Sequence, residues 1–362
     1  MAQSDEARFM ALALALGRRG LGRTWPNPAV GAVIVKDGII VGRGWTQAGG
    51  RPHAEIEALR RAGEAARGTT LYVTLEPCSH QGKSPPCADA IVAAGLARVV
   101  SALEDPNPEV AGAGHARLRA AGIAVEVGVG AEEARRDHAG HIRRMGDGRP
   151  HVTLKLAISA DGKAGAAGRR PVAITGAAAR DRVHLLRAQS DAIMVGIGTV
   201  LADDPMLTCR LPGMAAYSPV RIVLDRTLRL PLGSRLALSA RDVPVWVIAG
   251  AMASPALEEA LREREILVLR AAEANGCLEP VLELIAGRGI TRLMVEGGPS
   301  LAASFVAADL VDEAVLFHSP KVLGADGIDA LDGLPLTALT QSLRQLASEP
   351  VGADRCDVFE RR

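Results

Sequence analysis

Aromatic side chains are scarce in this chain of 362 residues, where Phe, Trp and Tyr together account for 2%. An excess of charge of one sign is also missing, because 42 Lys and Arg oppose 41 Asp and Glu. Proteins that bind nucleic acids use basic patches to meet phosphates and aromatic rings to stack on bases. We therefore expect no nucleic-acid partner, and a small-molecule substrate rather than a polymer.

Long apolar runs are absent as well. The run from Phe9 to Leu16 ends at Gly17-Arg18-Arg19, so it is too short for a membrane span and wrongly flanked for a signal peptide. The five cysteines are odd in number, and Cys209, Cys277 and Cys356 are scattered without a pattern, which argues against a disulfide framework. We expect a cytoplasmic protein with no membrane association.

The length exceeds the size at which one hydrophobic core usually stops growing, so the sequence predicts two domains. Two glycines and a proline stand among charged residues between Met145 and Pro150, which is typical of a linker. We place the domains at residues 1–147 and 148–362. Both alternate strands with helices, so the fold class is α/β, and the second domain is expected to hold a mostly parallel sheet covered by helices.

Periodicity and turn signals give the following expected elements. In the first domain, strands are expected at residues 30–35, 39–42, 70–75, 99–102 and 125–129, and helices at 5–18 and 55–66. In the second domain, strands are expected at residues 151–158, 192–195, 220–224, 243–248, 266–269, 292–295 and 313–317, and helices at 177–188 and 255–264.

The most informative motif is His53-Ala54-Glu55, followed by Pro77-Cys78 and then by Cys87. One imidazole and two thiolates form a three-ligand set for Zn²⁺, which leaves a fourth position open for water. Glu55 is placed to move protons around that water. The order matches the zinc deaminase signature, His-x-Glu followed by Pro-Cys-x-x-Cys. Eight residues separate the two cysteines here instead of two, so the match is one of type and order.

Two other interpretations of this motif remain open. His80 could serve as a fourth ligand and close the site, which would make the zinc structural, although Glu55 has no role in such a site. Cys78 and Cys87 could instead form a disulfide, which the odd cysteine count disfavours.

Glycine-rich turns follow two predicted strands of the second domain. The turn Gly297-Gly298-Pro299-Ser300 leads into an apolar helical pattern, and Gly196-Ile197-Gly198-Thr199 follows another strand. Each turn could present backbone N–H groups to the phosphates of a dinucleotide, or could be ordinary turn geometry. Asp203-Asp204-Pro205 is likewise either a carboxylate pair or a capped turn.

The motifs in their order resemble a known family over essentially the whole chain, the bifunctional deaminase/reductases of riboflavin biosynthesis. The deaminase half is matched at residues 26–31, 52–55, 73–87 and 105–108, where the long cysteine spacing is also found. The reductase half is matched at residues 154–155, 159–162, 174–176, 203–210 and 295–298.

For the first half, the resemblance implies a cytidine-deaminase-like three-layer fold. It places His53, Cys78 and Cys87 on zinc, with Glu55 as the proton shuttle. The substrate would be a diaminopyrimidinone ribosyl phosphate, from whose ring ammonia is released by a zinc-activated water. Four further residues would bind the pyrimidine and the phosphate: Asn27, His80, Lys83 and Asn107.

For the second half, the resemblance implies a dihydrofolate-reductase-like fold in which NADPH reduces the ribosyl group to a ribityl chain. The residues that would face NADPH are Ala157, Thr199, Asp203, Gly297, Gly298, Pro299 and Ser300. The residues that would face the substrate are Arg187, Leu207, Arg210 and Glu296. A homo-oligomer is also expected.

The chain departs from the family pattern in a few places. Pro171 and Ala173 stand where the family usually has Ser-x-Trp, so a weakened reductase half is an alternative. Thr46 stands where a histidine is common, and Ala160 where a leucine is usual. Two rival functions are a nucleic-acid or nucleoside deaminase with an accessory domain, and a non-catalytic zinc-binding protein, which the intact Glu55 argues against.

Overall fold

The computed structural model describes residues 2–82, 85–108, 110–169, 172–271 and 277–362. The chain separates into two compact units, with the division between Gly148 and Arg149. In the described ranges, no helix is long and apolar enough to cross a membrane.

Unit 1 (residues up to Gly148) is built on a five-stranded sheet in the order β2-β1-β3-β4-β5. The strands are β1 (Gly31–Lys36), β2 (Ile39–Trp45), β3 (Thr70–Val73), β4 (Arg98–Ser101) and β5 (Ala124–Val127). β1 is antiparallel to β2 and β3, whereas β3, β4 and β5 are mutually parallel. The five expected strands are confirmed, with ends that differ by at most three residues.

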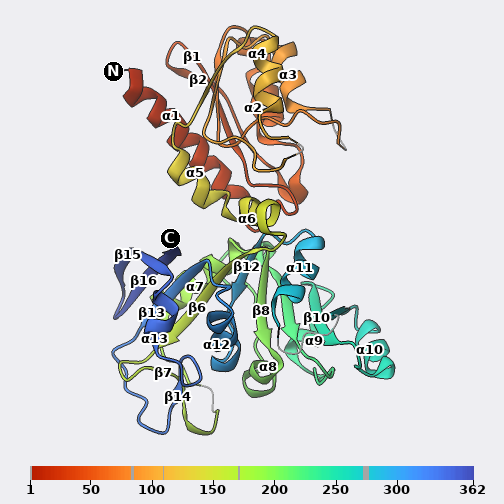
Figure 1. Cartoon of the computed structure of the whole chain (residues 1–362), viewed down its shortest axis with the longest axis vertical. Coiled ribbons are helices and arrows are strands. Elements are labelled where there is room, and N and C mark those ends of the chain that lie inside the picture. The colour runs from red at the N-terminus through yellow and green to blue at the C-terminus, as the bar shows by residue number, and fades with distance from the viewer. Residues whose placement is uncertain (1, 83–84, 109, 170–171, 272–276) are drawn as a thin grey trace. The chain divides into compact units, whose positions relative to one another are not determined.

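Helices cover both faces of this sheet, which gives three layers (Figure 1). The helices are α1 (Ala2–Gly17), α2 (Ala54–Ala62), α3 (Cys87–Ala94), α4 (Ala113–Ala120), α5 (Ala131–Asp137) and α6 (Ala139–Asp147). α1 packs on β1 and against α5, while α2, α3 and α4 follow one another on the other face (Figure 1).

Two glycines of β2 allow α2 to lie directly on the sheet. A Cβ atom at Gly42 would lie 2.4 Å from the Ala58 carbonyl oxygen, and one at Gly44 would lie 2.3 Å from that of Ala54. Any larger residue would push the helix away from the strand, because Cβ atoms do not approach backbone oxygen so closely. The start of α2, where His53 is the N-cap, is thereby fixed relative to the sheet.

Unit 2 (residues from Arg149) contains a nine-stranded sheet in the order β11-β10-β9-β8-β12-β6-β13-β16-β15. Its strands are β6 (His151–Ile158), β8 (Ala192–Gly196), β9 (Val220–Leu224), β10 (Val245–Gly250), β11 (Leu267–Ala271), β12 (Arg292–Val295), β13 (Glu313–His318), β15 (Leu343–Val351) and β16 (Asp354–Arg361). From β11 to β13 every neighbouring pair is parallel, which confirms the expected mostly parallel sheet. The helices are α7 (Ala177–Ala188), α8 (Ile197–Asp203), α9 (Arg235–Leu238), α10 (Pro255–Arg262), α11 (Glu279–Gly287), α12 (Pro299–Ala307) and α13 (Leu336–Thr340).

The antiparallel hairpin β15–β16 at one edge was not predicted from the sequence. The side chains of β15 are almost all exposed, so this strand lacks the apolar alternation by which a strand is recognised. A small separate pair, β7 (Lys163–Gly165) with β14 (Ile328–Asp329), was also missed. Its strands are only three and two residues long, which is too short to show a pattern.

Candidate functional site

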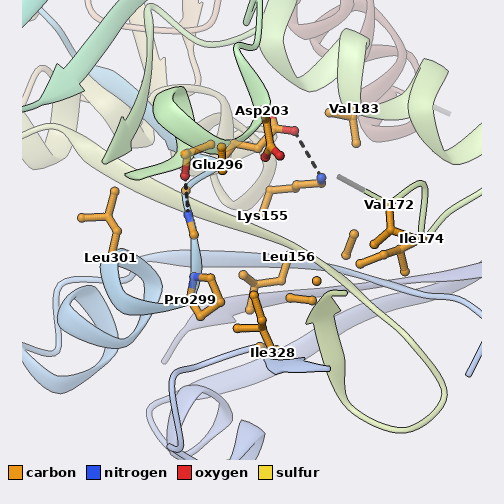
Figure 2. Close-up of a pocket in the computed structure, with 18 of the residues that line it drawn as sticks. Lys155, Leu156, Val172, Ile174, Val183, Asp203, Glu296, Pro299, Leu301 and Ile328 are labelled. Carbon is orange, nitrogen blue, oxygen red and sulfur yellow. Dashed lines mark hydrogen bonds and ion pairs between the residues drawn. The ribbon is translucent and has the colours of Figure 1, made fainter. Parts of the chain in front are cut away.

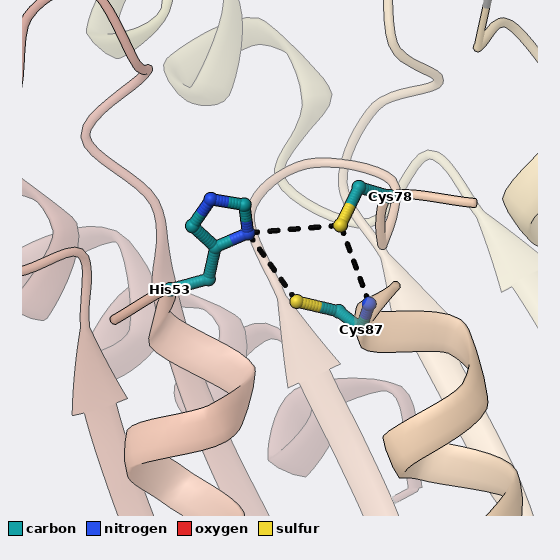
Figure 3. Close-up of side chains that lie close together, drawn as sticks. All are labelled: His53, Cys78 and Cys87. Atoms are coloured by element: carbon teal, nitrogen blue, oxygen red, sulfur yellow. Dashed lines mark hydrogen bonds between the residues drawn. The ribbon is translucent and has the colours of Figure 1, made fainter. Parts of the chain in front are cut away.

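Three side chains from separate elements of unit 1 converge on one point (Figure 3). His53 precedes α2, Cys78 lies in the loop after β3, and Cys87 is the first residue of α3. His53 Nδ1 lies 3.6 Å from Cys78 Sγ and 3.3 Å from Cys87 Sγ. The three possible ligand atoms lie within 4.8 Å of one another. An imidazole nitrogen and two sulfurs are the donor set that zinc takes in open, three-ligand sites, so these residues fit that metal.

The two thiols of this cluster have different pKa values. A hydrogen bond from Cys87, assisted by His53, lowers the pKa of Cys78 to about 4. The pKa of the Cys87 thiol is raised well above its usual value by its hydrogen bond to Cys78 and by burial. The backbone N–H of Cys87 also donates to Cys78 Sγ at 3.3 Å. The protein thus stabilises negative charge on sulfur at this point, which is what a cation site requires.

Glu55 lies one residue beyond the start of α2, with only 3% of its surface exposed. Burial raises its pKa above the ordinary value for glutamate. A carboxyl group with a raised pKa can both accept and return a proton near neutral pH. Its position next to the cluster therefore suits the shuttle role that the sequence predicted.

The structure tests the two other interpretations of the motif. All five cysteines of the chain are free, which excludes a Cys78–Cys87 disulfide in this structure. His80 is exposed and is not part of the grouping formed by His53, Cys78 and Cys87, so the described residues form an open site rather than a closed one.

The other residues expected at the first site have different surroundings. The Asn27 side-chain amide donates to the Gly50 carbonyl at 2.8 Å and lies 3.4 Å from His53 Nε2, so Asn27 borders the cluster. Asn107 is partly buried, and its N–H donates to Asp105 Oδ1 at 2.9 Å. Lys83 lies outside the described residues. Thr46, at a position where the family often has histidine, is buried and accepts the Val30 N–H through its hydroxyl.

Unit 2 contains a cavity of about 500 Å³ that gathers most of the predicted reductase residues (Figure 2). The predicted residues that line it are Ala157, Arg187, Thr199, Asp203, Arg210, Glu296, Gly297, Gly298, Pro299 and Ser300. Leu207 is 3% exposed and is not among the described lining residues, so the structure does not bring it to this cavity.

A charged cluster forms one wall of the cavity. Glu296, which follows β12, pairs with Lys155 of β6 at 3.2 Å and with Arg187 of α7 at 2.8 Å. Burial alone would raise the pKa of Glu296, but the two cations lower it below the usual value for glutamate. The cluster carries a net positive charge, which suits an anionic ligand such as a sugar phosphate.

The glycine turn before α12 offers fewer N–H groups than expected. The Gly298 N–H donates to the Thr199 hydroxyl at 3.1 Å, and Pro299 has no N–H to give. A Cβ atom at Gly297 would lie 2.7 Å from Leu301 Cδ2, so this glycine also serves the packing of the turn. The turn thus joins α8 to α12 through the Gly298 N–H, which is therefore engaged within the protein.

The two neighbouring aspartates at the C-terminal end of α8 have separate roles. Asp203 lines the cavity, and burial raises its pKa. Asp204 is the C-cap of α8 at a φ of 39°, and its carboxylate accepts the Arg235 N–H at 2.8 Å. The capped-turn interpretation therefore holds for Asp204, and the two carboxylates do not act as a pair.

Sequence reasoning missed three residues of the cavity with basic side chains: Lys155, Arg180 and His184. Lys155 belongs to a motif quoted for the resemblance, so its alternation along β6 could have identified it, since residues of one face recur every second position. Arg180 and His184 lie one turn apart on α7, on the face that also carries Arg187. That helical spacing was the available signal.

Comparison with known proteins matches both units. Residues 3–103 match the family model of the cytidine and deoxycytidylate deaminase zinc-binding region, and residues 150–356 match the RibD C-terminal domain. The units accordingly have a cytidine-deaminase-like and a dihydrofolate-reductase-like fold.

Relatives match over the full length. The riboflavin biosynthesis protein RibD of Escherichia coli is 43% identical, covering 96% of this chain and 97% of the relative. That of Aquifex aeolicus is 41% identical and covers 100% of both chains. Two solved structures are similar throughout. RibD of Acinetobacter baumannii has a TM-score of 0.88 at 36% identity, with 99% of each chain covered. The diaminohydroxyphosphoribosylaminopyrimidine deaminase/5-amino-6-(5-phosphoribosylamino)uracil reductase of Thermotoga maritima has a TM-score of 0.87 at 34% identity, with 100% of each chain covered. With two domain models in order and relatives of this identity along its whole length, the chain belongs to the RibD family of riboflavin biosynthesis proteins.

Proposed function

We propose that this chain carries out two successive reactions on a pyrimidine ribosyl phosphate of riboflavin biosynthesis. Unit 1 deaminates 2,5-diamino-6-(5-phosphoribosylamino)pyrimidin-4(3H)-one, and unit 2 then uses NADPH to reduce the ribosyl group to ribityl. The observation that carries the proposal is the convergence of His53, Cys78 and Cys87 beside the buried Glu55.

In the deamination, His53 Nδ1 and the sulfurs of Cys78 and Cys87 hold the zinc. The metal, when bound, supplies a Lewis acid that makes water a nucleophile at neutral pH. The Glu55 carboxylate accepts a proton from the attacking water and returns it to the departing amino group, so that the C–N bond breaks and ammonia leaves. Burial raises the pKa of Glu55, which favours the acceptance of that proton. Asn27, His80, Lys83 and Asn107 are proposed to hold the pyrimidine and its phosphate.

In the reduction, the cavity of unit 2 would hold the substrate and NADPH. Ala157, Thr199, Asp203 and the turn from Gly297 to Ser300 are proposed to face the cofactor, which supplies a hydride for C1′ of the sugar. Arg187, Arg210 and Glu296 are proposed to face the substrate, since the two guanidinium groups suit a phosphate. Leu207 belongs to this set by resemblance, although it is not among the described residues that line the cavity.

One coupled assay tests the proposal. Purified, zinc-replete protein is given the diaminopyrimidinone ribosyl phosphate, and ammonia release and NADPH oxidation are followed together. Both signals are expected. Ammonia without NADPH oxidation would reject the reductase half of the proposal, and neither signal would reject the substrate.

We also propose that the protein works in the cytoplasm as a homo-oligomer. Five free cysteines favour a reducing compartment. Association would bring several copies of both sites within reach of one released intermediate. Size-exclusion chromatography with light scattering measures the assembly, and a monomeric mass at working concentrations would reject it.

A further inference from the structure

Glu76 stands two residues before the metal-ligand candidate Cys78, and it is 4% exposed. Its carboxylate accepts four backbone N–H groups. Oε1 accepts from Gly114 at 2.7 Å and from His115 at 3.0 Å. Oε2 accepts from Gly112 at 3.0 Å and from Asp105 at 3.1 Å. All four donors belong to one segment, here called the 105–115 loop, which comprises residues 105–108 and 110–112 and the first three residues of α4 (113–115).

These bonds use the full acceptor capacity of the side chain. An ionised carboxylate has about four lone-pair positions, and four N–H groups occupy them. Glu76 also lies in a grouping with Glu104 and His115 that has the composition of a metal site. Because the oxygens of Glu76 are already engaged, this grouping is better explained as an anchor for the loop than as a second metal site.

The loop also touches the ligand segment through its backbone. A Cβ atom at Gly114 would lie 2.0 Å from the Pro77 carbonyl oxygen, so the loop packs against the residue immediately before Cys78. At the other end of the loop, Asp105 Oδ1 accepts the Asn107 N–H at 2.9 Å and lies 3.0 Å from His141 Nε2. A chain of short contacts thus runs from the Cys78 segment through Glu76 and Asp105 to Asn107.

We propose that Glu76 is a positioning residue for the deaminase site, which sets Asn107 at a fixed place relative to Cys78. The inference rests on the proposed function in so far as Asn107 contacts the pyrimidine substrate. Glu76 acts on substrate binding through the loop, and the metal is held without it.

Glu76→Gln tests this role with little change in size. Its NH₂ group cannot accept a hydrogen bond, so whichever way the amide is turned, two loop N–H groups lose their acceptor. Leaving a buried N–H group unpaired costs more free energy than the hydrogen bond itself contributes, so the loop should shift and displace Asn107. We therefore expect the deaminase KM to rise about tenfold or more. The turnover number should change less, and the zinc content should stay at one per chain. Hydrogen exchange at residues 112–115 should become faster.

Glu104→Gln is the matched control, since this exposed carboxylate belongs to the same grouping but lacks the four bonds. It should leave KM and exchange unchanged. Gly114→Ala disturbs the position of the same loop without altering charge. It should also raise KM, because its Cβ forces the loop away from Pro77. NADPH oxidation with the deaminated intermediate reports that unit 2 of each variant is folded. Circular dichroism of the whole chain then reports any loss of structure in unit 1.

Unchanged KM and exchange in folded Glu76→Gln would overturn the proposal. Loss of zinc in step with activity would overturn it too, because Glu76 would then act on the metal ligands. If Glu76→Gln does not fold, Gly114→Ala decides by the same two measurements. Absence of ammonia release in the wild type would instead reject the proposed function, while the exchange rates would still report the anchor.

Discussion

The metal-ligand cluster of unit 1 draws on residues 53 to 87, whereas the cavity of unit 2 takes its lining from positions between 155 and 330. The first centre needs three uncommon donor side chains and one buried carboxylate. The second uses backbone, small residues and charged groups that are common elsewhere in the chain. Chemistry in the first centre is set by the identity of a few atoms, and in the second by the shape and charge of a surface. Single substitutions should therefore abolish the first reaction but only weaken the second.

Removal of zinc should have the largest effect and separate the two centres most cleanly. A chelator that strips the metal should abolish ammonia release, since no residue of the chain replaces a Lewis acid. NADPH oxidation with the deaminated intermediate should persist within about twofold, because unit 2 folds around its own core. Metal analysis and both assays on the same sample measure this. Recovery of ammonia release on adding Zn²⁺ is the control, and loss of both activities together would break the comparison.

Glu55→Gln should nearly abolish deamination while leaving the metal in place. Loss of a positioned acid–base group costs about 10²- to 10⁴-fold in rate. The matched control is Glu57→Gln on the same helix, whose carboxylate pairs with Arg60 at 3.0 Å and faces no reacting atom in this scheme. Single-turnover ammonia release and zinc content measure the effect. Ammonia release at the wild-type rate would remove Glu55 from proton transfer.

Glu296→Gln tests whether charge organises the second centre. The variant leaves Lys155 and Arg187 together without their counter-charge. Breaking a buried pair costs about 3 to 5 kcal/mol, and this partly exposed cluster should lose about 2 kcal/mol of the free energy of unfolding. The reductase KM should rise at the same time, with deamination unaffected. Glu283→Gln, an exposed site on α11, is the control, and equal stability of both variants would contradict the prediction.

The same variant gives a prediction for acid pH. The folded-state pKa of Glu296 is lowered, so its carboxylate stabilises the fold above its unfolded pKa, and this stabilisation is lost as the pH falls. The stability difference between the wild type and Glu296→Gln should therefore shrink as the pH drops below about 4. Denaturant unfolding at several pH values measures it, and a difference that grows in acid would mean that the pair is not formed.

The contrast between the centres also explains what the sequence could predict. His53 precedes a helix and Cys78 follows a strand that apolar periodicity locates, and few chemistries need a histidine with two cysteines as donors. Glu76 was overlooked because its partners are backbone N–H groups 29 to 39 positions away. Every residue type except proline has such a group, so the sequence does not reveal these partners. The strands of the parallel sheet were recognisable as apolar runs, but the exposed β15 was not.

In unit 2, local patterns pointed to the glycine turns and to Asp203, but the remaining lining residues could be named only through resemblance. The ion pairs of Glu296 join β6, α7 and the end of β12, and no local pattern indicates that these elements meet. The same holds for Leu207, which was predicted only from the resemblance to face the substrate; it is buried, at a φ of 55°, and is not among the described residues that line the cavity. The cap at Asp204 was one of the two interpretations that the sequence offered, because aspartate before proline is typical of a turn.

Ala173→Trp should have the smallest effect and sharpen the comparison. Ala173 is exposed and lines the cavity where the family usually has tryptophan, whereas Pro171 lies outside the described residues. An added indole would give NADPH an aromatic surface worth about 1 kcal/mol, so its KM should fall by about three- to tenfold. The control is Ala251→Trp, an exposed position of unit 2 away from the lining. A lower KM for NADPH would show that single side chains of the cavity lining change cofactor binding gradually. An unchanged or higher KM for NADPH would mean that this chain binds the cofactor without an aromatic side chain at this position.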